Sequence, residues 1–109
     1  MPARGYPLDI DALILFELAR EAGSGPDILR RVRRRMQENG YKLNYGSWYP
    51  ALKRLERKGL VSGTLVDAPE RSGRARRAKV YVLTEEGKGA AQALSTVIRN
   101  LILPLEASA

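Results

Sequence analysis

Residues 44–61 read NYGSWYPALKRLERKGLV, and this stretch decides the fold of the chain. Trp48, Leu52 and Leu55 recur at helical spacing and define one apolar face. Gly59 follows the last of them, and glycine supplies the left-handed residue that ends many helices. The segment therefore predicts an amphipathic helix whose outer face carries small residues at its start and basic residues further along.

Two residues of this segment bear on where the helix begins. Asn44 is a strong capping residue, so the predicted helix runs from there to Lys58, with Tyr45 on its apolar face. Pro50 removes a backbone donor, which counts against a helix. It falls within the first two turns, where a kink costs least, and we therefore keep the helix across the proline.

Two helices are predicted to precede this segment. Asp9 can cap a first helix, which Gly23 stops, and its apolar residues cover more than one stripe, so we expect burial on two sides. Residues 24–26 form the turn into a second helix that runs to about Asn39, with Gly40 as its cap. Five arginines surround the narrow apolar stripe of this second helix, which predicts a surface position.

A β-hairpin and a last helix are predicted to follow. Residues 60–66 and 80–83 have the composition of strands, and the Arg-rich residues 67–78 predict a mobile hairpin tip. Thr84 can cap a final helix whose apolar positions approach a coiled-coil repeat, and Pro104 is expected to end or kink it at the preceding residue. The order predicts a mainly α fold with a small β-hairpin wing, a winged helix-turn-helix followed by a C-terminal dimerisation helix.

The composition limits the functions that the chain can have. Its 109 residues leave room for one domain, and 44% of them are hydrophobic, enough for one packed core. Cys and His are absent, which excludes disulfides, thiolate or imidazole metal sites and nucleophile–histidine triads. With no motif of paired acids in a plausible cleft, we expect no enzyme, no cofactor and no metal. The lack of Cys fits a reducing cytoplasm, and no apolar run approaches the roughly 20 residues of a membrane span.

The positive charge is concentrated in the middle of the chain. The formal net charge is +7, yet residues 24–83 alone carry +10, and both ends are slightly acidic. Three consecutive basic segments favour a face that binds a polyanion such as nucleic acid. A solvated basic surface is the alternative interpretation.

Two motifs resemble one known family. Residues 46–61, GSWYPALKRLERKGLV, resemble the recognition-helix signature of PadR-like transcriptional regulators. Residues 79–87, KVYVLTEEG, resemble the second wing strand and the start of the final helix of that family. The resemblance covers about residues 8–105, and the short final helix is similar to the smaller branch of the family. It implies a winged helix-turn-helix that dimerises through its C-terminal helix, often with help from the first. Members are mostly bacterial repressors, and small aromatic or lipophilic compounds release some of them from DNA.

The chain departs from this family in two places. Many members have a His-Gly-Tyr-Glu-like stretch at the start of the second helix, where this chain has Ser24-Gly25-Pro26-Asp27 and therefore lacks the tyrosine. Multidrug-binding relatives sandwich flat ligands with an aromatic side chain of the C-terminal helix. The last helix here has no Phe, Tyr or Trp, which argues against that mode of binding.

The outer face of the predicted reading helix suits the major groove of DNA, because small residues at its start allow a close approach of the backbone. Asn44, Ser47 and Lys53 can reach base edges, whereas Arg54 and Arg57 suit phosphates or guanine. Tyr49 suits either a phosphate hydrogen bond or simple packing. The predicted DNA-binding residues of helix and wing are Asn44, Ser47, Tyr49, Lys53, Arg54, Arg57, Arg71, Arg74, Arg76 and Arg77.

Other charged residues have supporting roles in this interpretation. The wing arginines suit a narrow minor groove or its phosphates, with a solvated tip as the alternative. Glu56 is expected to pair within its own helix with Lys53 or Arg57. The arginines expected to position the reading helix on the DNA backbone are Arg30, Arg31, Arg34 and Arg35, and mere solubility is the alternative for them.

The apolar stripe of the last helix needs a partner, because a domain of this size has too little core to cover it. Packing back onto its own domain is the alternative. The predicted dimer interface comprises Phe16, Leu94, Val97, Ile98, Leu101 and Leu105. A pocket for a small lipophilic effector is expected where this helix meets the first helix of the partner, lined by Phe16, Leu94, Val97, Ile98 and Leu101; the same side chains can instead fill that space.

We therefore divide the chain into a flexible N-terminal arm (1–7), a winged helix-turn-helix DNA-binding domain (8–83) and a C-terminal dimerisation helix (84–109). The sequence predicts a homodimeric, sequence-specific DNA-binding transcriptional regulator, in keeping with a repressor, that reads a palindromic operator with residues 44–58 and 67–78. A non-specific module for RNA or DNA and a winged-helix protein-interaction domain are the alternatives.

Overall fold

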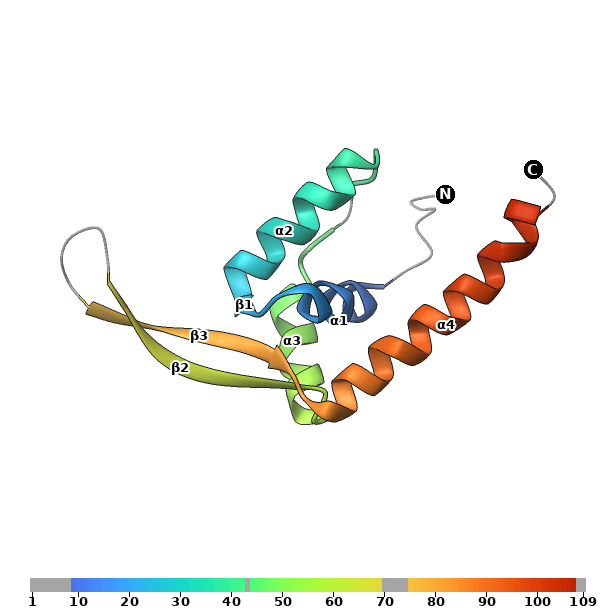
Figure 1. The fold of residues 1–109 in the computed structure, drawn as a ribbon. Helices are drawn as coiled ribbons and strands as arrows, with labels where there is room; N and C mark the ends of the chain where they lie inside the picture. The colour runs from blue at the N-terminus through green and yellow to red at the C-terminus, as the bar shows by residue number, and fades with distance from the viewer. Residues whose placement is uncertain (1–8, 43, 70–74, 108–109) are drawn as a thin grey trace.

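The computed structural model describes residues 9–42, 44–69 and 75–107 of the chain (Figure 1). Within them lie four helices and a three-stranded antiparallel sheet, which confirms the predicted mainly helical winged fold. In chain order the elements are α1 (Ile10–Arg20), β1 (Gly23–Ser24), α2 (Gly25–Glu38), α3 (Trp48–Arg57), β2 (Val61–Pro69), β3 (Ala75–Leu83) and α4 (Glu85–Ala107).

The first two helices begin where their caps predict. The Asp9 side chain accepts a hydrogen bond from the Ala12 backbone N–H at 2.9 Å, and the Ser24 hydroxyl accepts one from the Asp27 N–H at 3.2 Å. The first helix ends at Arg20, before the glycine expected to stop it. Gly23 and Ser24 instead form β1, whose pairing with β3 had no signal in the sequence.

The third helix begins later than predicted. It starts at Trp48, and Asn44 does not cap it, because the Asn44 side-chain oxygen accepts a hydrogen bond from the Gly46 N–H at 2.9 Å in the preceding turn. Pro50 is therefore the third residue of the helix, where a backbone N–H has no acceptor within the helix anyway. The predicted end is confirmed, since Gly59 has a φ of +78° directly after the helix.

The hairpin strands are longer than the sequence suggested. They pair in register from Val61 opposite Leu83 to Pro69 opposite Ala75. The prediction of a mobile tip over residues 67–78 is therefore wrong for its two ends, which are paired strand, and residues 70–74 lie outside the described part. The extra pairs join Asp67, Ala68 and Pro69 to Arg77, Arg76 and Ala75, so no alternation of large apolar residues marks them in the sequence.

The core lies where α1 meets the other helices and the base of the hairpin. Trp48 and Leu52 of α3 are buried against Ile14 of α1 and Ile28 of α2, and Val61 closes the core at the start of the wing. Because α1 contacts α2, α3, β3 and α4, it is the central helix of the fold (Figure 1).

The last helix is only partly packed onto this core. Thr84 caps it as predicted, accepting from the Gly87 N–H at 3.0 Å, and Ala91 is buried against the core. Figure 1 shows α4 extending away from the rest of the molecule. The helix continues to Ala107, so Pro104 does not end it, and a kink at Pro104 stays a prediction.

Two glycines near the start of α4 are expected to affect stability in opposite directions when each is replaced by alanine. A Cβ at Gly87 would overlap the backbone carbonyl oxygen of Leu60, which cannot move without displacing the strand that follows, whereas a Cβ at Gly89 meets nothing within 4 Å. We expect Gly87→Ala to lower the free energy of unfolding by about 3 kcal/mol. Gly89→Ala should raise it by about 1 kcal/mol, because alanine favours a helix.

Chemical denaturation of the two variants beside the unmodified protein measures both changes. An unfolding free energy for Gly87→Ala equal to that of the unmodified protein would contradict the close packing of α4 on Leu60.

Candidate nucleic-acid interface

The outer face of α3 presents two basic side chains to solvent. Lys53 and Arg57 are exposed and lie four residues apart, so they share one side of the helix. Neither has an ion-pair partner within the described part of the chain. Ser47 and Gly46 lie exposed just before them, which leaves the start of the helix open to close approach. Of the predicted DNA-binding residues whose side chains the structure describes, these two cations are the ones most available for an anion.

Arg54, predicted to contact DNA, already has a protein partner. Its Nε lies 3.1 Å from Asp11 Oδ2 and its Nη2 lies 2.5 Å from Asp11 Oδ1. Hydrogen bonding to this carboxylate raises the pKa of Arg54 above its ordinary value. The pair ties α3 to α1, and a role for Arg54 in DNA binding stays a prediction.

Arg35 of α2 is held by a buried acid. Its Nε and Nη2 donate to the two carboxylate oxygens of Glu17 at 3.1 and 3.3 Å, and Glu17 is only 3% exposed. This hydrogen bonding raises the pKa of Arg35. The sequence analysis did not single out Glu17, although a lone acid within the apolar run LILFELA was the available signal.

The remaining arginines of α2 divide into paired and unpaired side chains. Arg31 donates to the backbone oxygens of Glu21 and Ala22 at 3.2 and 3.3 Å. Arg30 pairs with Asp27, and this hydrogen bond lowers the pKa of that carboxyl group. Arg34 is exposed and has no ion-pair partner among the described residues. Arg34 is therefore the freest of the four arginines predicted to lie along the DNA backbone.

Tyr49 stands at the start of α3 beside a hollow. Its side chain is 52% exposed, and its ring lies so close to Gly25 that a Cβ there would meet Tyr49 Cε1 at 3.1 Å. The hollow, of about 620 Å³, is bounded by the start of α2, by Tyr49 and by the hairpin, and Arg30 and Arg77 also line it. Tyr49 thus has both an open side and a packing contact, and both of its predicted roles stay open.

The wing meets α3 through an ion pair that the sequence analysis missed. Lys79 Nζ of β3 lies 3.0 Å from Glu56 Oε1, so the prediction that Glu56 pairs within its own helix is wrong. Sequence spacing favours partners three or four residues away, whereas the fold brings a strand alongside. Hydrogen bonding to Glu56 raises the pKa of Lys79.

The other predicted wing residues are only partly described. Arg77 lies opposite Asp67 in the hairpin, with its Nε 3.6 Å from Asp67 Oδ1. Arg76 lies opposite Ala68. Arg71 and Arg74 fall outside the described residues.

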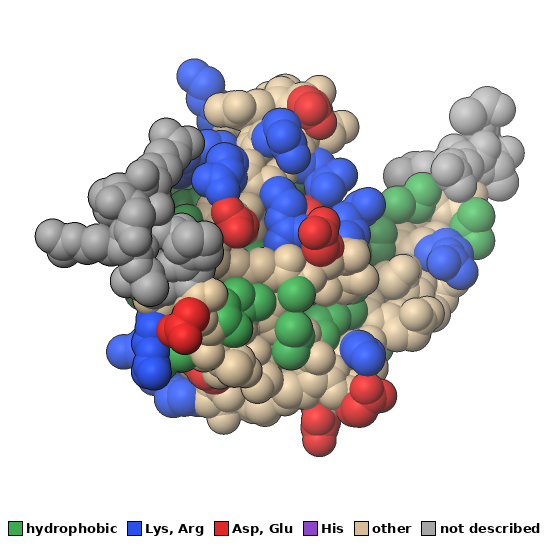
Figure 2. Space-filling view, turned by 60° about the vertical axis from the view of Figure 1, so that its left-hand side comes forward, with side chains coloured by type: hydrophobic (Ala, Val, Ile, Leu, Met, Phe, Trp, Pro, Cys, Tyr) green, Lys and Arg blue, Asp and Glu red, His purple; other side chains and the backbone are tan. Residues whose placement is uncertain are grey.

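Figure 2 shows that the resulting surface is basic but mixed, with acidic side chains among the Lys and Arg side chains. Some acids of the chain hold arginines in place: Asp27 pairs with Arg30, and Glu21 pairs with Arg31. An anion can therefore be bound by fewer side chains than the total charge suggests.

The surface predicted to form a dimer is apolar and open on α4. Leu101 is 68% exposed and Val97 55% exposed, while Leu94 and Ile98 are half-buried. Phe16 of α1 packs against the edge of the core. Leu105 lies in α4, but its side chain is not among those described.

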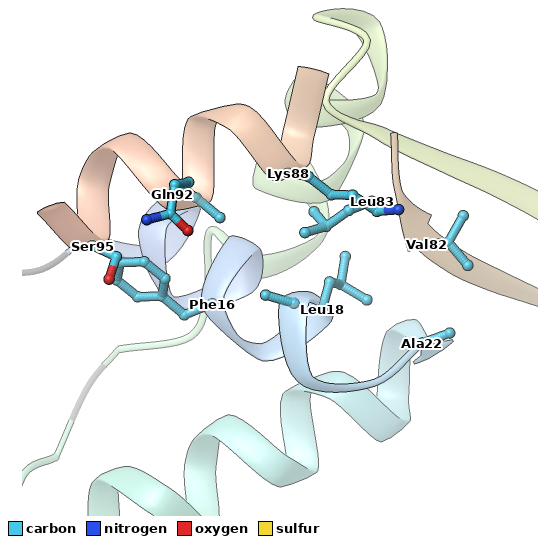
Figure 3. A pocket seen from close by; sticks show the side chains of 10 residues that line it. Phe16, Leu18, Ala22, Val82, Leu83, Lys88, Gln92 and Ser95 are labelled. Atoms are coloured by element: carbon cyan, nitrogen blue, oxygen red, sulfur yellow. The ribbon is translucent and has the colours of Figure 1, made fainter. Parts of the chain in front are cut away.

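A hollow of about 700 Å³ lies between α1, β3 and α4 of the single chain (Figure 3). Phe16, Leu18 and Leu83 supply apolar walls, and Lys88 and Gln92 of α4 supply polar groups. Of the residues predicted to line an effector pocket, only Phe16 belongs to this hollow.

Among the described residues, no helix has the length and apolar character needed to cross a membrane.

Three helices followed by a hairpin wing, with exposed basic side chains on the third helix, define a winged helix-turn-helix protein. Within this class, the chain belongs to the transcriptional regulator PadR-like family, whose sequence pattern matches residues 14–93. This confirms the resemblance that residues 46–61 and 79–87 carried. A comparison with curated protein sequences finds no match.

Several solved structures have a similar fold. A PadR family transcription regulator from hypervirulent Clostridium difficile R20291 is 30% identical, with a TM-score of 0.68 over 88% of this chain and 96% of that one. The protein smu.1704 from Streptococcus mutans UA159 is 26% identical, with a TM-score of 0.69 over 93% and 89%. Bacillus subtilis PadR, solved in complex with operator DNA, is 22% identical, with a TM-score of 0.63 over 78% of this chain and 45% of that one.

Proposed function

We propose that this protein is a homodimeric repressor of transcription that reads a palindromic operator with α3 and the wing. The observation that carries the proposal is the outer face of α3, where Lys53 and Arg57 are exposed and unpaired among the described residues beside the hairpin. Bacillus subtilis PadR, which has this fold, was solved bound to operator DNA. A regulator of this kind works on the chromosome, and we therefore place it in the cytoplasm.

The dimer follows from the apolar surface of α4. Leu101, Ile102 and Val97 are exposed in the single chain, and exposed apolar surface of this extent on a helix marks a contact with another protein. A two-fold dimer places two copies of α3 on one side of the DNA, about one helical turn apart. Residues 84–109 would then serve assembly and residues 8–83 DNA binding. The two-fold symmetry of the dimer makes the operator palindromic.

A non-specific nucleic-acid module is the main alternative. It would use the same cations but would need neither a dimer nor a palindrome. Its affinity would fall with salt and would not depend on the sequence of the nucleic acid. The two functions are separated by selecting binding sites from a random pool of DNA duplexes. A recovered palindrome supports the repressor, and a pool without enrichment contradicts it.

We expect Lys53→Ala and Arg57→Ala each to weaken binding to the selected operator about ten-fold, because each removes a groove or phosphate contact. Arg99→Ala removes the same charge from α4, far along the chain from α3, and should leave affinity nearly unchanged. Fluorescence anisotropy at several salt concentrations measures the affinities, and the slope against salt should fall for the two α3 variants. Equal affinities for all three variants would remove α3 from the interface.

We expect Leu101→Glu to convert the dimer to a monomer, because it would bury an unpaired charge at the interface. Thr96→Glu adds the same charge to an exposed position on the other side of α4 and should preserve the dimer. Sedimentation velocity reports the mass of both variants. A Leu101→Glu protein that sediments as the unmodified dimer does would place the interface elsewhere.

We also propose that a small lipophilic compound binds the hollow between α1, β3 and α4 and changes DNA affinity. Ala91 forms part of its wall, and Ala91→Leu should narrow the hollow and weaken the response to such a compound. The measurement is operator affinity of both proteins across a panel of hydrophobic compounds. A panel without effect on the unmodified protein favours a repressor that has no effector.

A further inference from the structure

The wing and the reading helix are joined at one cluster of side chains. Lys79 Nζ lies 3.0 Å from Glu56 Oε1 of α3 and 5.4 Å from the centre of the Tyr81 ring. Lys79 belongs to β3, whereas Glu56 lies one residue before Arg57, on the helix that faces DNA in the proposed function. The cluster therefore links the two parts that would enter neighbouring grooves.

Gly63 makes room for this link. A Cβ on Gly63 would overlap Lys79 Cε and would lie 3.1 Å from Tyr81 Cε1 and 3.2 Å from Glu56 Oε2. The φ of Gly63 is not among the positive values of the chain, so the glycine serves space and not backbone conformation. The Lys79 stem thus passes over Gly63 to reach Glu56.

Beyond the short strand β1, which pairs with Val80 and Tyr81 of β3, the hairpin has little else to fix its direction. Val61 is buried at its base, but Leu65 and Val66 further along β2 are exposed, and Figure 1 shows the two strands extending away from the helices. A two-stranded ribbon twists easily when no third layer covers it. The next ion pair along the hairpin, between Asp67 and Arg77, joins one strand to the other. It does not contact α3 and so does not fix the angle between the hairpin and that helix.

We propose that Glu56 and Lys79, with Gly63 beneath them, form a clamp that sets the angle between α3 and the wing. This inference rests on the proposed function, since that angle decides whether the wing reaches the groove beside the one that α3 reads. Glu56 and Lys79 are positioning residues. By holding the wing in place before DNA binds, they lower the entropic cost of ordering the wing on DNA.

The clamp makes a prediction opposite in sign to plain electrostatics. Glu56 is an acid on a helix that faces a polyanion, so its neutralisation should strengthen binding if charge alone matters. If the clamp operates, its neutralisation frees the wing and weakens binding. The pair is part-exposed, so its effect on global stability is expected to be small.

The first experiment measures affinity for the selected operator. We expect Glu56→Gln to weaken binding about five-fold, the upper range for an exposed ion pair. Glu86→Gln removes an exposed acid at the start of α4 and should not weaken it. The exchange Glu56→Lys with Lys79→Glu keeps the net charge and should restore most of the affinity. Binding by Glu56→Gln that equals or exceeds that of the unmodified protein would overturn the clamp.

Footprinting then shows which contact is lost. Hydroxyl-radical protection should fade in the minor groove flanking each half-site for Glu56→Gln and for Gly63→Ala. Protection of guanine N7 in the major groove against methylation should persist, because the basic face of α3 is unchanged. Loss of both protections in parallel would indicate a general defect in the helix and would contradict a role confined to the wing.

A third measurement does not depend on DNA. The chain has no Cys, so spin labels can be attached at Lys58→Cys and Val66→Cys alone. The distance distribution between them should be narrow with Glu56 present and broad in the Glu56→Gln protein. Equal widths would overturn the clamp. If the unmodified protein selects no operator, the proposed function fails, and the distance widths still decide whether the clamp exists.

Discussion

The hydrogen-bonded ion pair between Glu17 and Arg35 is the contact on which the helix-turn-helix depends. Glu17 sits almost fully buried in the central helix, and its two carboxylate oxygens each accept from Arg35, while Arg31 lies within 3.9 Å. A buried carboxylate without a partner is costly, so α1 and α2 can pack here only in the arrangement that brings the guanidinium to it. Asp11 and Arg54 repeat this arrangement between α1 and α3. The two pairs fix both helices relative to α1.

This arrangement divides the positive charge into two groups. One group is bound to acids and serves the fold, as Arg35 and Arg54 do. The other group, which includes Lys53, Arg57 and Arg34, lies exposed without ion-pair partners in the described part of the chain. The large positive charge of the middle segment therefore overstates the surface open to an anion. Specific reading of DNA in the proposed function rests on a few cations whose positions are held by the others.

The sequence predicted what local chemistry determines and missed what the fold brings together. Asp9 and Gly59 mark helix ends because a cap or a left-handed glycine acts within four residues. Asn44 misled because its side chain bonds equally well two residues ahead, in a turn. The partner of Glu56 and the role of Glu17 depend on elements far away in the chain, and a single sequence does not show which elements become neighbours. The outer, basic face of α3 and its buried face were both predictable, because both follow from helical spacing.

The central position of α1 connects the two proposed activities. Phe16 lines the hollow toward α4, and the next residue, Glu17, holds the arginines of α2. A displacement of α1 by a partner helix or a bound compound would therefore move α2 with it, because the buried carboxylate of Glu17 is costly to leave without its guanidinium partner. It would also move α3, which shares the apolar core with α1. The wing would follow α3 through Glu56 and Lys79. In the proposed dimer, assembly, response to a compound and spacing of the reading heads are then consequences of where one apolar helix with two buried or half-buried acids lies.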